Sequence, residues 1–213
     1  MPRSLRLDHE GAWHHVMNRG AGRRAIFSSD ADREHFLGCC ISAAKLYGLE
    51  LHAYCLLGNH YHLLVRSNAG RLSDAMRWLS SRYTQSINYD KGQDGPLFRG
   101  RFASVLICEE EHLLEASRYI HLNPVSAGLA SVPEQWPWSS ASAYLNIIPT
   151  PQWLATDAIL SMFGARGSCQ TYANYLAAGQ EHDALKSYEK RMSEHGVRPA
   201  GSDPGAAGSS AKS

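Results

Sequence analysis

The chain has 213 residues, of which 44% are hydrophobic and 19% charged, and its formal net charge is +1. This composition is typical of a globular protein with one main domain and excludes a fully disordered chain. The sequence has no apolar run long enough to cross a membrane and no signal-peptide core at its start, so we expect a cytoplasmic protein without a membrane partner. Its five cysteines form no CxxC pair, which argues against a disulfide framework or a zinc ribbon.

Hydrophobic periodicity predicts the elements of the main domain, because alternation marks strands and a spacing of three or four residues marks helices. In chain order we first predict a strand at Ala12–Arg19 and a helix that starts at caps in Ser28–Asp32 and ends at Gly48. Strands at Leu51–Leu57 and from His60 follow, and then a helix from Leu72 to about Lys91. The domain ends with a strand at Arg101–Cys108 and a helix from Glu109 that stops near Pro124. Gly58-Asn59, between two apolar runs, predicts a tight hairpin. The order βαββαβ plus a helix predicts an α+β, ferredoxin-like sandwich with an additional C-terminal helix.

The rest of the chain is predicted to form an appendage. We expect short helices at Trp153–Phe163 and Gln170–Ala178, and we expect Trp136 and Trp138 to pack on the core. The predicted organisation is a main domain over residues 1–145, a helical extension over 146–192, and a disordered tail rich in Gly, Ser, Pro and Ala over 193–213.

Two histidines flank one bulky residue at the head of the third predicted strand. Side chains alternate along a strand, so His60 and His62 point to one face of the sheet while Tyr61 points to the other. Two neutral imidazoles side by side are half of a divalent-metal site. The first and third strands are central in this topology, which would give such a site a rigid support.

A second candidate pair lies on the helix after the fourth predicted strand. Tyr119 and Asn123 are four residues apart and therefore share a helical face. Taken alone, a tyrosine there is typical of a core position, and an asparagine before Pro124 is typical of a helix end.

Basic residues gather in one stretch of this nearly neutral chain. Residues 66–101 hold seven basic and three acidic side chains, a local net charge of +4. Such a stripe permits phosphate binding without establishing it, since solvated helix faces produce the same count.

Four ordered motifs, at residues 58–64, 95–102, 118–125 and 136–140, together resemble the single-tyrosine HUH transposases. Within this family the chain is similar to the REP-associated tyrosine transposase branch, over about Ala12 to Tyr144. One mild difference is that Tyr61, between the two histidines, is bulky but not aliphatic.

The resemblance implies a metal-dependent endonuclease and strand transferase that acts on single-stranded DNA. It makes His60 and His62 the ligands of Mg²⁺ or Mn²⁺, and Tyr119 the nucleophile that forms a 5′-phosphotyrosine. Asn123 falls where relatives complete the metal site, although Glu115, one turn before Tyr119, offers a carboxylate that suits Mg²⁺ better.

The resemblance also implies the partners. The substrate would be hairpins of repetitive extragenic palindromes, bound by a monomer rather than a dimer, in a bacterial protein associated with the nucleoid. The candidate phosphate contacts are Arg19, Arg23, Arg24, Arg82, Arg99 and Arg101.

Two other readings stay open. Ferredoxin-like sheets also serve as non-catalytic DNA- or RNA-binding modules, and a domesticated transposase that only binds DNA would keep the same sequence. In the hairpin register set by Gly58-Asn59, Cys55 lies across from His62, so a zinc hydrolase with ligands His60, His62 and Cys55 is conceivable.

Overall fold

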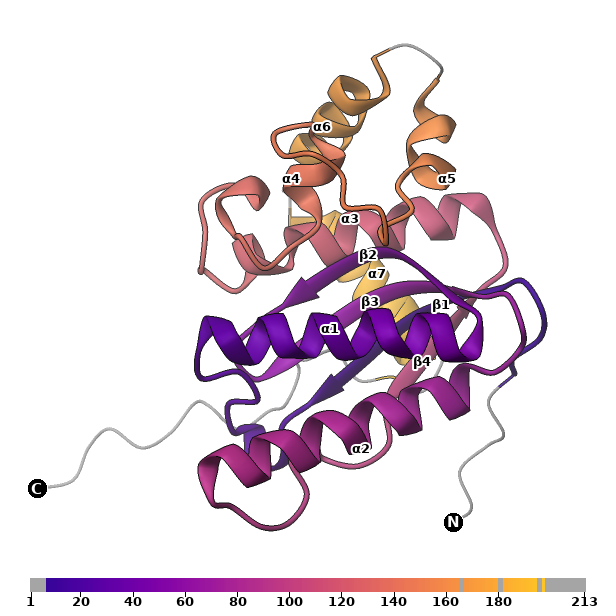
Figure 1. The fold of residues 1–213 in the computed structure, drawn as a ribbon. Helices are drawn as coiled ribbons and strands as arrows, with labels where there is room; N and C mark the ends of the chain where they lie inside the picture. The colour runs from indigo at the N-terminus through magenta and orange to yellow at the C-terminus, as the bar shows by residue number, and fades with distance from the viewer. Residues whose placement is uncertain (1–6, 165–166, 180–181, 195–196, 198–213) are drawn as a thin grey trace, which may run out of the picture.

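The computed structural model describes residues 7–164, 167–179, 182–194 and 197. Its centre is one antiparallel sheet of four strands in the order β2-β3-β1-β4 (Figure 1). The strands are β1 (Ala12–Arg19), β2 (Leu49–Leu56), β3 (His60–Ser67) and β4 (Ala103–Ile107). The ferredoxin-like prediction is confirmed, and β1 and β3 are the two central strands.

The hairpin between β2 and β3 has the register that the Gly58-Asn59 turn predicts. Cys55 pairs with His62 and Leu56 with Tyr61, while the backbone N–H of Leu57 donates to His60. On the other side of β3, Met17 of β1 pairs with His62, and Arg19 pairs with His60. Because paired residues point to the same face, the side chains of Arg19, Cys55 and His60 share one face of the sheet.

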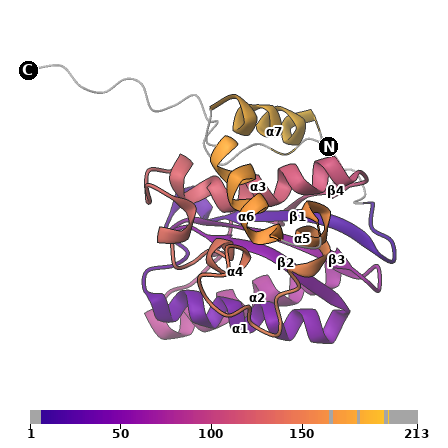
Figure 2. The same ribbon diagram turned by 90° about the horizontal axis from the view of Figure 1, so that it is seen from above.

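Helices cover both faces of the sheet, as Figure 2 shows from above: α1 (Asp30–Tyr47) and α2 (Leu72–Lys91) on one side, α3 (Glu110–Ser126) and α7 (His182–Glu194) on the other. Alternation along β3 divides its side chains between two apolar clusters. Tyr61, Leu63 and Val65 pack in the cluster under α1 and α2, whereas Leu64 packs in the cluster under α3. His62 therefore faces α3.

The first helix begins and ends where its sequence signals predict. The Ser29 side chain accepts a hydrogen bond from the backbone N–H of Asp32, and Gly48 closes the helix with a φ of 68°. In α2 the buried side chains recur at helical spacing from Leu72 to Ile87.

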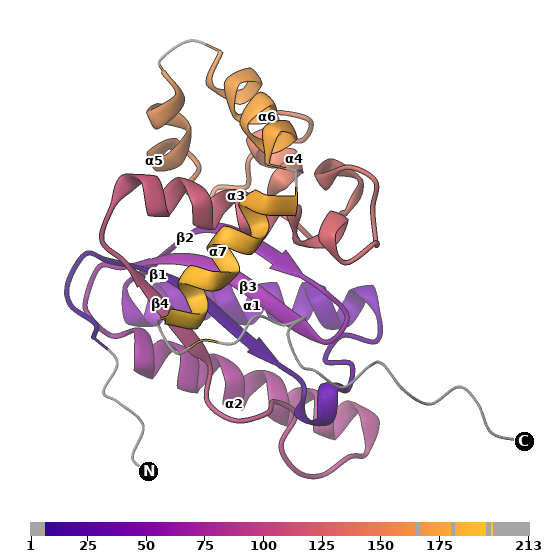
Figure 3. The ribbon, with the colours of Figure 1, turned by 180° about the vertical axis from the view of Figure 1, so that it is seen from behind.

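Residues after α3 form a layer of short elements above it. These are η2 (Pro133–Gln135), α4 (Ala141–Tyr144), α5 (Asp157–Leu160), η3 (Ser161–Phe163) and α6 (Ser168–Ala178). Helix α7 then crosses the face of the sheet beside α3 (Figure 3). Trp138 and Trp136 pack against the two apolar clusters, which confirms their predicted place in the core. No helix within the described ranges combines the length and apolarity needed to span a membrane. Of the predicted tail, Ser193 and Glu194 belong to α7, and all later residues except Val197 lie outside the described ranges.

Several predicted element boundaries were wrong, and three of them have a clear physical reason or a shift of two residues. The second strand runs over Leu49–Leu56 rather than Leu51–Leu57. The predicted strand Arg101–Cys108 is shortened to β4, because residues before Ala103 follow the end of β1 irregularly: Arg99 N–H donates to Arg19, and the Asn18 amide donates to Gly100. The predicted helix Trp153–Phe163 begins only at Asp157, because Leu154 and Ala155 instead run along the edge of β2 at Leu51.

Candidate active site

His60 and His62 stand side by side at the start of β3 with their ring centroids 5.2 Å apart. The Nδ1 atom of each ring is engaged: His60 Nδ1 lies 2.7 Å from Asn59 Oδ1, and His62 Nδ1 lies 2.9 Å from His15 Nε2. The two Nε2 atoms are buried and have no hydrogen-bond partner among the described residues. An unpartnered nitrogen in a buried site is costly unless a ligand uses it.

These two rings fit the role of metal ligands, which requires neutral imidazole with a free lone pair. Burial lowers the pKa of His60 to about 4, although the nearby Asn123 side chain opposes this shift. Burial also lowers the pKa of His62 well below its usual range, and the neighbouring His15 and His60 add to the effect. Both rings are therefore neutral at physiological pH, and their unpartnered Nε2 atoms suit a divalent cation.

Tyr119 lies on α3 against His62. Its ring centroid is 5.6 Å from that of His62, and its side chain is only 5% exposed. Burial raises the pKa of the Tyr119 phenol, the carboxylate of Glu189 raises it further, and the Asn123 side chain lowers it. The structure thus brings the helix tyrosine against one of the two strand histidines, His62.

Asn123 joins the same site from the next turn of α3. It is buried, its amide donates to the Tyr119 carbonyl oxygen at 3.4 Å, and its side chain is close enough to the His60 ring to raise the pKa of that ring. Asn123 does not end the helix, since α3 continues through Pro124 to Ser126. An amide oxygen suits Mg²⁺ or Mn²⁺, so Asn123 beside His60 is the candidate third ligand.

The two alternative third ligands are placed less favourably. The carboxylate of Glu115 lies 3.5 Å from Arg191 of α7. Cys55 does pair with His62 and is fully buried, and burial raises the pKa of its thiol, which disfavours the thiolate that zinc binds. Across the described part of the chain, no three His, Cys, Asp or Glu side chains gather in a group that could hold a metal. This geometry argues against the zinc-hydrolase reading.

Two residues that the sequence did not single out complete the site. His15 on β1 is fully buried between His62 and Tyr188 of α7, and it lies 3.0 Å from the Tyr188 hydroxyl. The Tyr188 ring also packs on Tyr119 with centroids 4.9 Å apart. Alternation along the first strand places His15 on the face that His62 occupies, which is the one sequence signal that could have indicated it.

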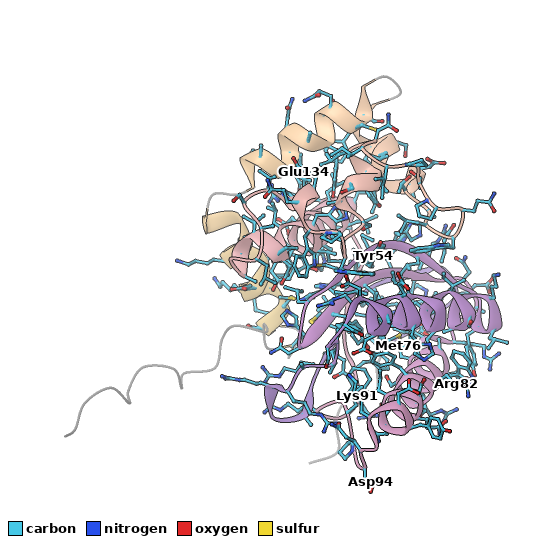
Figure 4. The ribbon with its side chains drawn as sticks, turned by 60° about the vertical axis from the view of Figure 1, so that its left-hand side comes forward. Tyr54, Met76, Arg82, Lys91, Asp94 and Glu134 are labelled. Carbon is cyan, nitrogen blue, oxygen red and sulfur yellow. The ribbon has the colours of Figure 1, made fainter. Side chains whose placement is uncertain are left out.

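Five of the six predicted arginines gather at the end of the sheet that holds His60. Arg19 pairs with His60, the Arg23 carbonyl accepts from Asn59, and Arg24 donates to Pro96 at 2.7 Å. Arg99 and Arg101 lie in the segment that follows the end of β1. The sixth, Arg82, is exposed on α2, on the opposite side of the sheet from α3, as Figure 4 shows. The structure therefore does not place Arg82 with the other five.

Comparison with known proteins shows the family to which this chain belongs. Residues 9–123 match the family model described as IS200-like transposase. The match spans more than half of the chain and includes both histidines, Tyr119 and Asn123. The chain belongs to the IS200-like transposase family, which confirms the resemblance derived from its motifs.

Two relatives carry the name of the REP-associated branch. A protein of Haemophilus influenzae, provisionally named a REP-associated tyrosine transposase, is 29% identical over 105 residues, which cover 44% of this chain and 60% of that protein. A solved structure of a REP-associated tyrosine transposase bound to a REP hairpin matches with a TM-score of 0.59 and 19% identity, over 74% of this chain and 93% of that one. At this identity the structural match shows the shared fold.

Proposed function

We propose that this chain is a metal-dependent endonuclease and strand transferase that acts on single-stranded DNA hairpins through a 5′-phosphotyrosine. The observation that carries the proposal is the pair of buried, unpartnered Nε2 atoms of His60 and His62, with the Tyr119 ring centroid 5.6 Å from that of His62. Family membership and the hairpin bound by the relative of known structure support it.

His60, His62 and Asn123 would hold Mg²⁺ or Mn²⁺, which when bound would withdraw charge from the scissile phosphate and orient it. Tyr119 Oη then attacks the phosphorus in line, the bond to the 3′ oxygen breaks, and the DNA keeps a free 3′-hydroxyl. The phenolic proton is lost to a base or to water, and the leaving 3′ oxygen takes up a proton. Because burial raises the pKa of Tyr119, the proton is expected to leave during the attack rather than before it.

A tyrosine nucleophile suits strand transfer better than it suits hydrolysis. The phosphotyrosine keeps the energy of the phosphodiester bond, so a 3′-hydroxyl can attack it and rejoin strands. The arginines beside His60 would contact the hairpin backbone near the scissile phosphate, and they carry no sequence information by themselves. The covalent chemistry needs one tyrosine and one ion per chain, which is compatible with a monomer.

The test is incubation with labelled single-stranded REP-type hairpins and Mn²⁺ or Mg²⁺, scored for cleavage and for a covalent protein–DNA adduct. Tyr119→Phe removes one oxygen and almost no volume, so we expect hairpin binding to survive while cleavage and adduct disappear together. The matched control is Tyr61→Phe, which removes the same atom from a fully buried tyrosine on the other face of β3 and should leave the adduct intact.

Three outcomes would contradict the proposal. An adduct that persists in Tyr119→Phe would assign the nucleophile to another residue. Cleavage by the wild type without any adduct would indicate a hydrolytic nuclease. Hairpin binding without cleavage in either metal would favour a non-catalytic DNA-binding module.

A further inference from the structure

His15 connects the histidine pair to helix α7 through an unbroken chain of hydrogen-bonded side chains. It lies on β1, the neighbour of β3 in the sheet, and none of its surface is exposed. Its Nε2 is 2.9 Å from Nδ1 of His62, and its Nδ1 is 3.0 Å from the hydroxyl of Tyr188. Both nitrogens of His15 are thus used within the protein, and neither is available to a ligand.

Only one of the two possible proton arrangements leaves His62 able to bind a cation. If His15 carried its proton on Nε2 and donated it to His62 Nδ1, His62 would hold its own proton on Nε2. That N–H would be a buried donor without a partner. If His62 Nδ1–H instead donates to His15 Nε2, the lone pair of His62 Nε2 faces the site.

The Tyr188 hydroxyl then stabilises the same arrangement from α7. With its Nε2 accepting from His62, His15 carries its proton on Nδ1 and donates it to Tyr188 Oη. The Tyr188 ring is itself fixed by packing on His15 and Tyr119, with centroids 5.7 Å and 4.9 Å away. Two segments more than a hundred residues apart therefore set the position of one proton on His62.

We propose that His15 is a positioning residue that holds His62 in the tautomer with a free Nε2 lone pair, and that Tyr188 extends this support from helix α7. The inference rests on the proposed metal-binding function of His62, and it assigns α7 a part in building the site. Hydrogen-bond partners of metal-ligating histidines change metal affinity about 10- to 100-fold when they are removed.

The first test measures Mn²⁺ affinity of the full chain by titration calorimetry, without DNA. His15→Leu removes both nitrogens and should weaken Mn²⁺ binding by about 10- to 100-fold. His15→Gln places an amide oxygen where Nε2 was, so it can still accept from His62 and should restore most of the affinity. The matched control is His14→Leu, which changes the adjacent buried histidine on the opposite face of β1 and should leave Mn²⁺ affinity unchanged. Tyr188→Phe should give a smaller loss than His15→Leu.

The second test reads the tautomer in the wild type itself and uses a variant only to assign the signal. Long-range proton–nitrogen NMR of the metal-free wild type, labelled at histidine nitrogens, should show the His62 proton on Nδ1, with His62 assigned by its absence in His62→Gln. A proton on His62 Nε2 would overturn the inference.

The outcomes separate this inference from the proposed function. If the wild type binds Mn²⁺ and His15→Leu binds it equally well, the positioning role is wrong while the metal site stands. If the wild type binds neither Mn²⁺ nor Mg²⁺, the proposed metal dependence fails and this inference fails with it.

Discussion

Acidification should destabilise this protein strongly, because the folded protein buries histidines in their neutral form and unfolding lets them take up a proton. His121 on α3 is fully buried, with Nδ1 2.6 Å from the Tyr172 hydroxyl and Nε2 2.7 Å from the Ser140 hydroxyl. Burial lowers the pKa of His121 from 6.5 to about 3. Burial likewise lowers the pKa of His15 to about 3, and the nearby His112 adds to that shift.

The direction of the pH effect on stability follows from proton binding. Between pH 6.5 and about 3 the unfolded chain binds a proton at each of these two histidines and the folded protein does not. The free energy of unfolding is therefore complete above pH 6.5 and falls as the pH decreases, by about 1.4 kcal/mol per histidine for each pH unit. At about pH 5.5 the two residues together remove about 3 kcal/mol, a large share of the roughly 5–15 kcal/mol that stabilises a typical domain.

The assay is urea unfolding of the metal-free protein at about pH 7.5 and about pH 5.5, followed by circular dichroism. His121→Gln cannot titrate, so it should reduce the loss between these pH values by about 1.4 kcal/mol. An equal urea midpoint at both pH values would refute the view that these histidines are buried and neutral.

Two further predictions concern the substrate and the metal. Hairpin affinity should fall steeply as salt rises despite the net charge of +1, because the arginines near His60 would displace counterions from phosphates; binding that does not respond to salt would contradict this placement. Asn123→Asp should bind Mg²⁺ more tightly than the wild type and Asn123→Ala more weakly, because a carboxylate is the better ligand for this hard cation. Equal Mg²⁺ affinity of all three proteins, measured by calorimetry, would remove Asn123 from the metal site.

The sequence predicted those parts of the fold that local patterns determine. Strand alternation and the Gly58-Asn59 turn were enough to place Cys55 opposite His62, because a tight hairpin leaves only one register that keeps the apolar side chains inside. The caps of α1 were readable for the same reason. Boundaries failed where tertiary contacts compete with periodicity, as at Leu154, which lies along the edge of β2 instead of entering a helix.

The residues of the candidate site likewise divide into those that local spacing predicts and those that it does not. Spacing alone puts His60 with His62, and Tyr119 with Asn123, on shared faces, and the fold then brings the two pairs together. Alternation puts His15 on the face that His62 occupies, but no local feature of the run Trp13-His14-His15-Val16 marks a hydrogen-bond partner 47 residues away, so the sequence did not single out His15. The contribution of α7 was equally hidden, since the sequence predicted no separate helix over His182–Glu194 and no role for it in the site.

Helix α7 places a physical constraint on any reaction at Tyr119. Tyr188 and Glu189 lie against the Tyr119 side chain, which leaves it 5% exposed. A phosphodiester needs an open line to Oη opposite the leaving oxygen, and α7 occupies the space around that hydroxyl. The arginines beside His60 lie at the end of the sheet and do not depend on α7 for their position. Under the proposed function, hairpin binding would not need α7 to move, whereas attack by Tyr119 would require α7 to shift while Tyr188 still supports His15. The same helix thus both builds the site and limits access to it, so a local movement of α7, rather than its complete loss, is the change that geometry favours for catalysis.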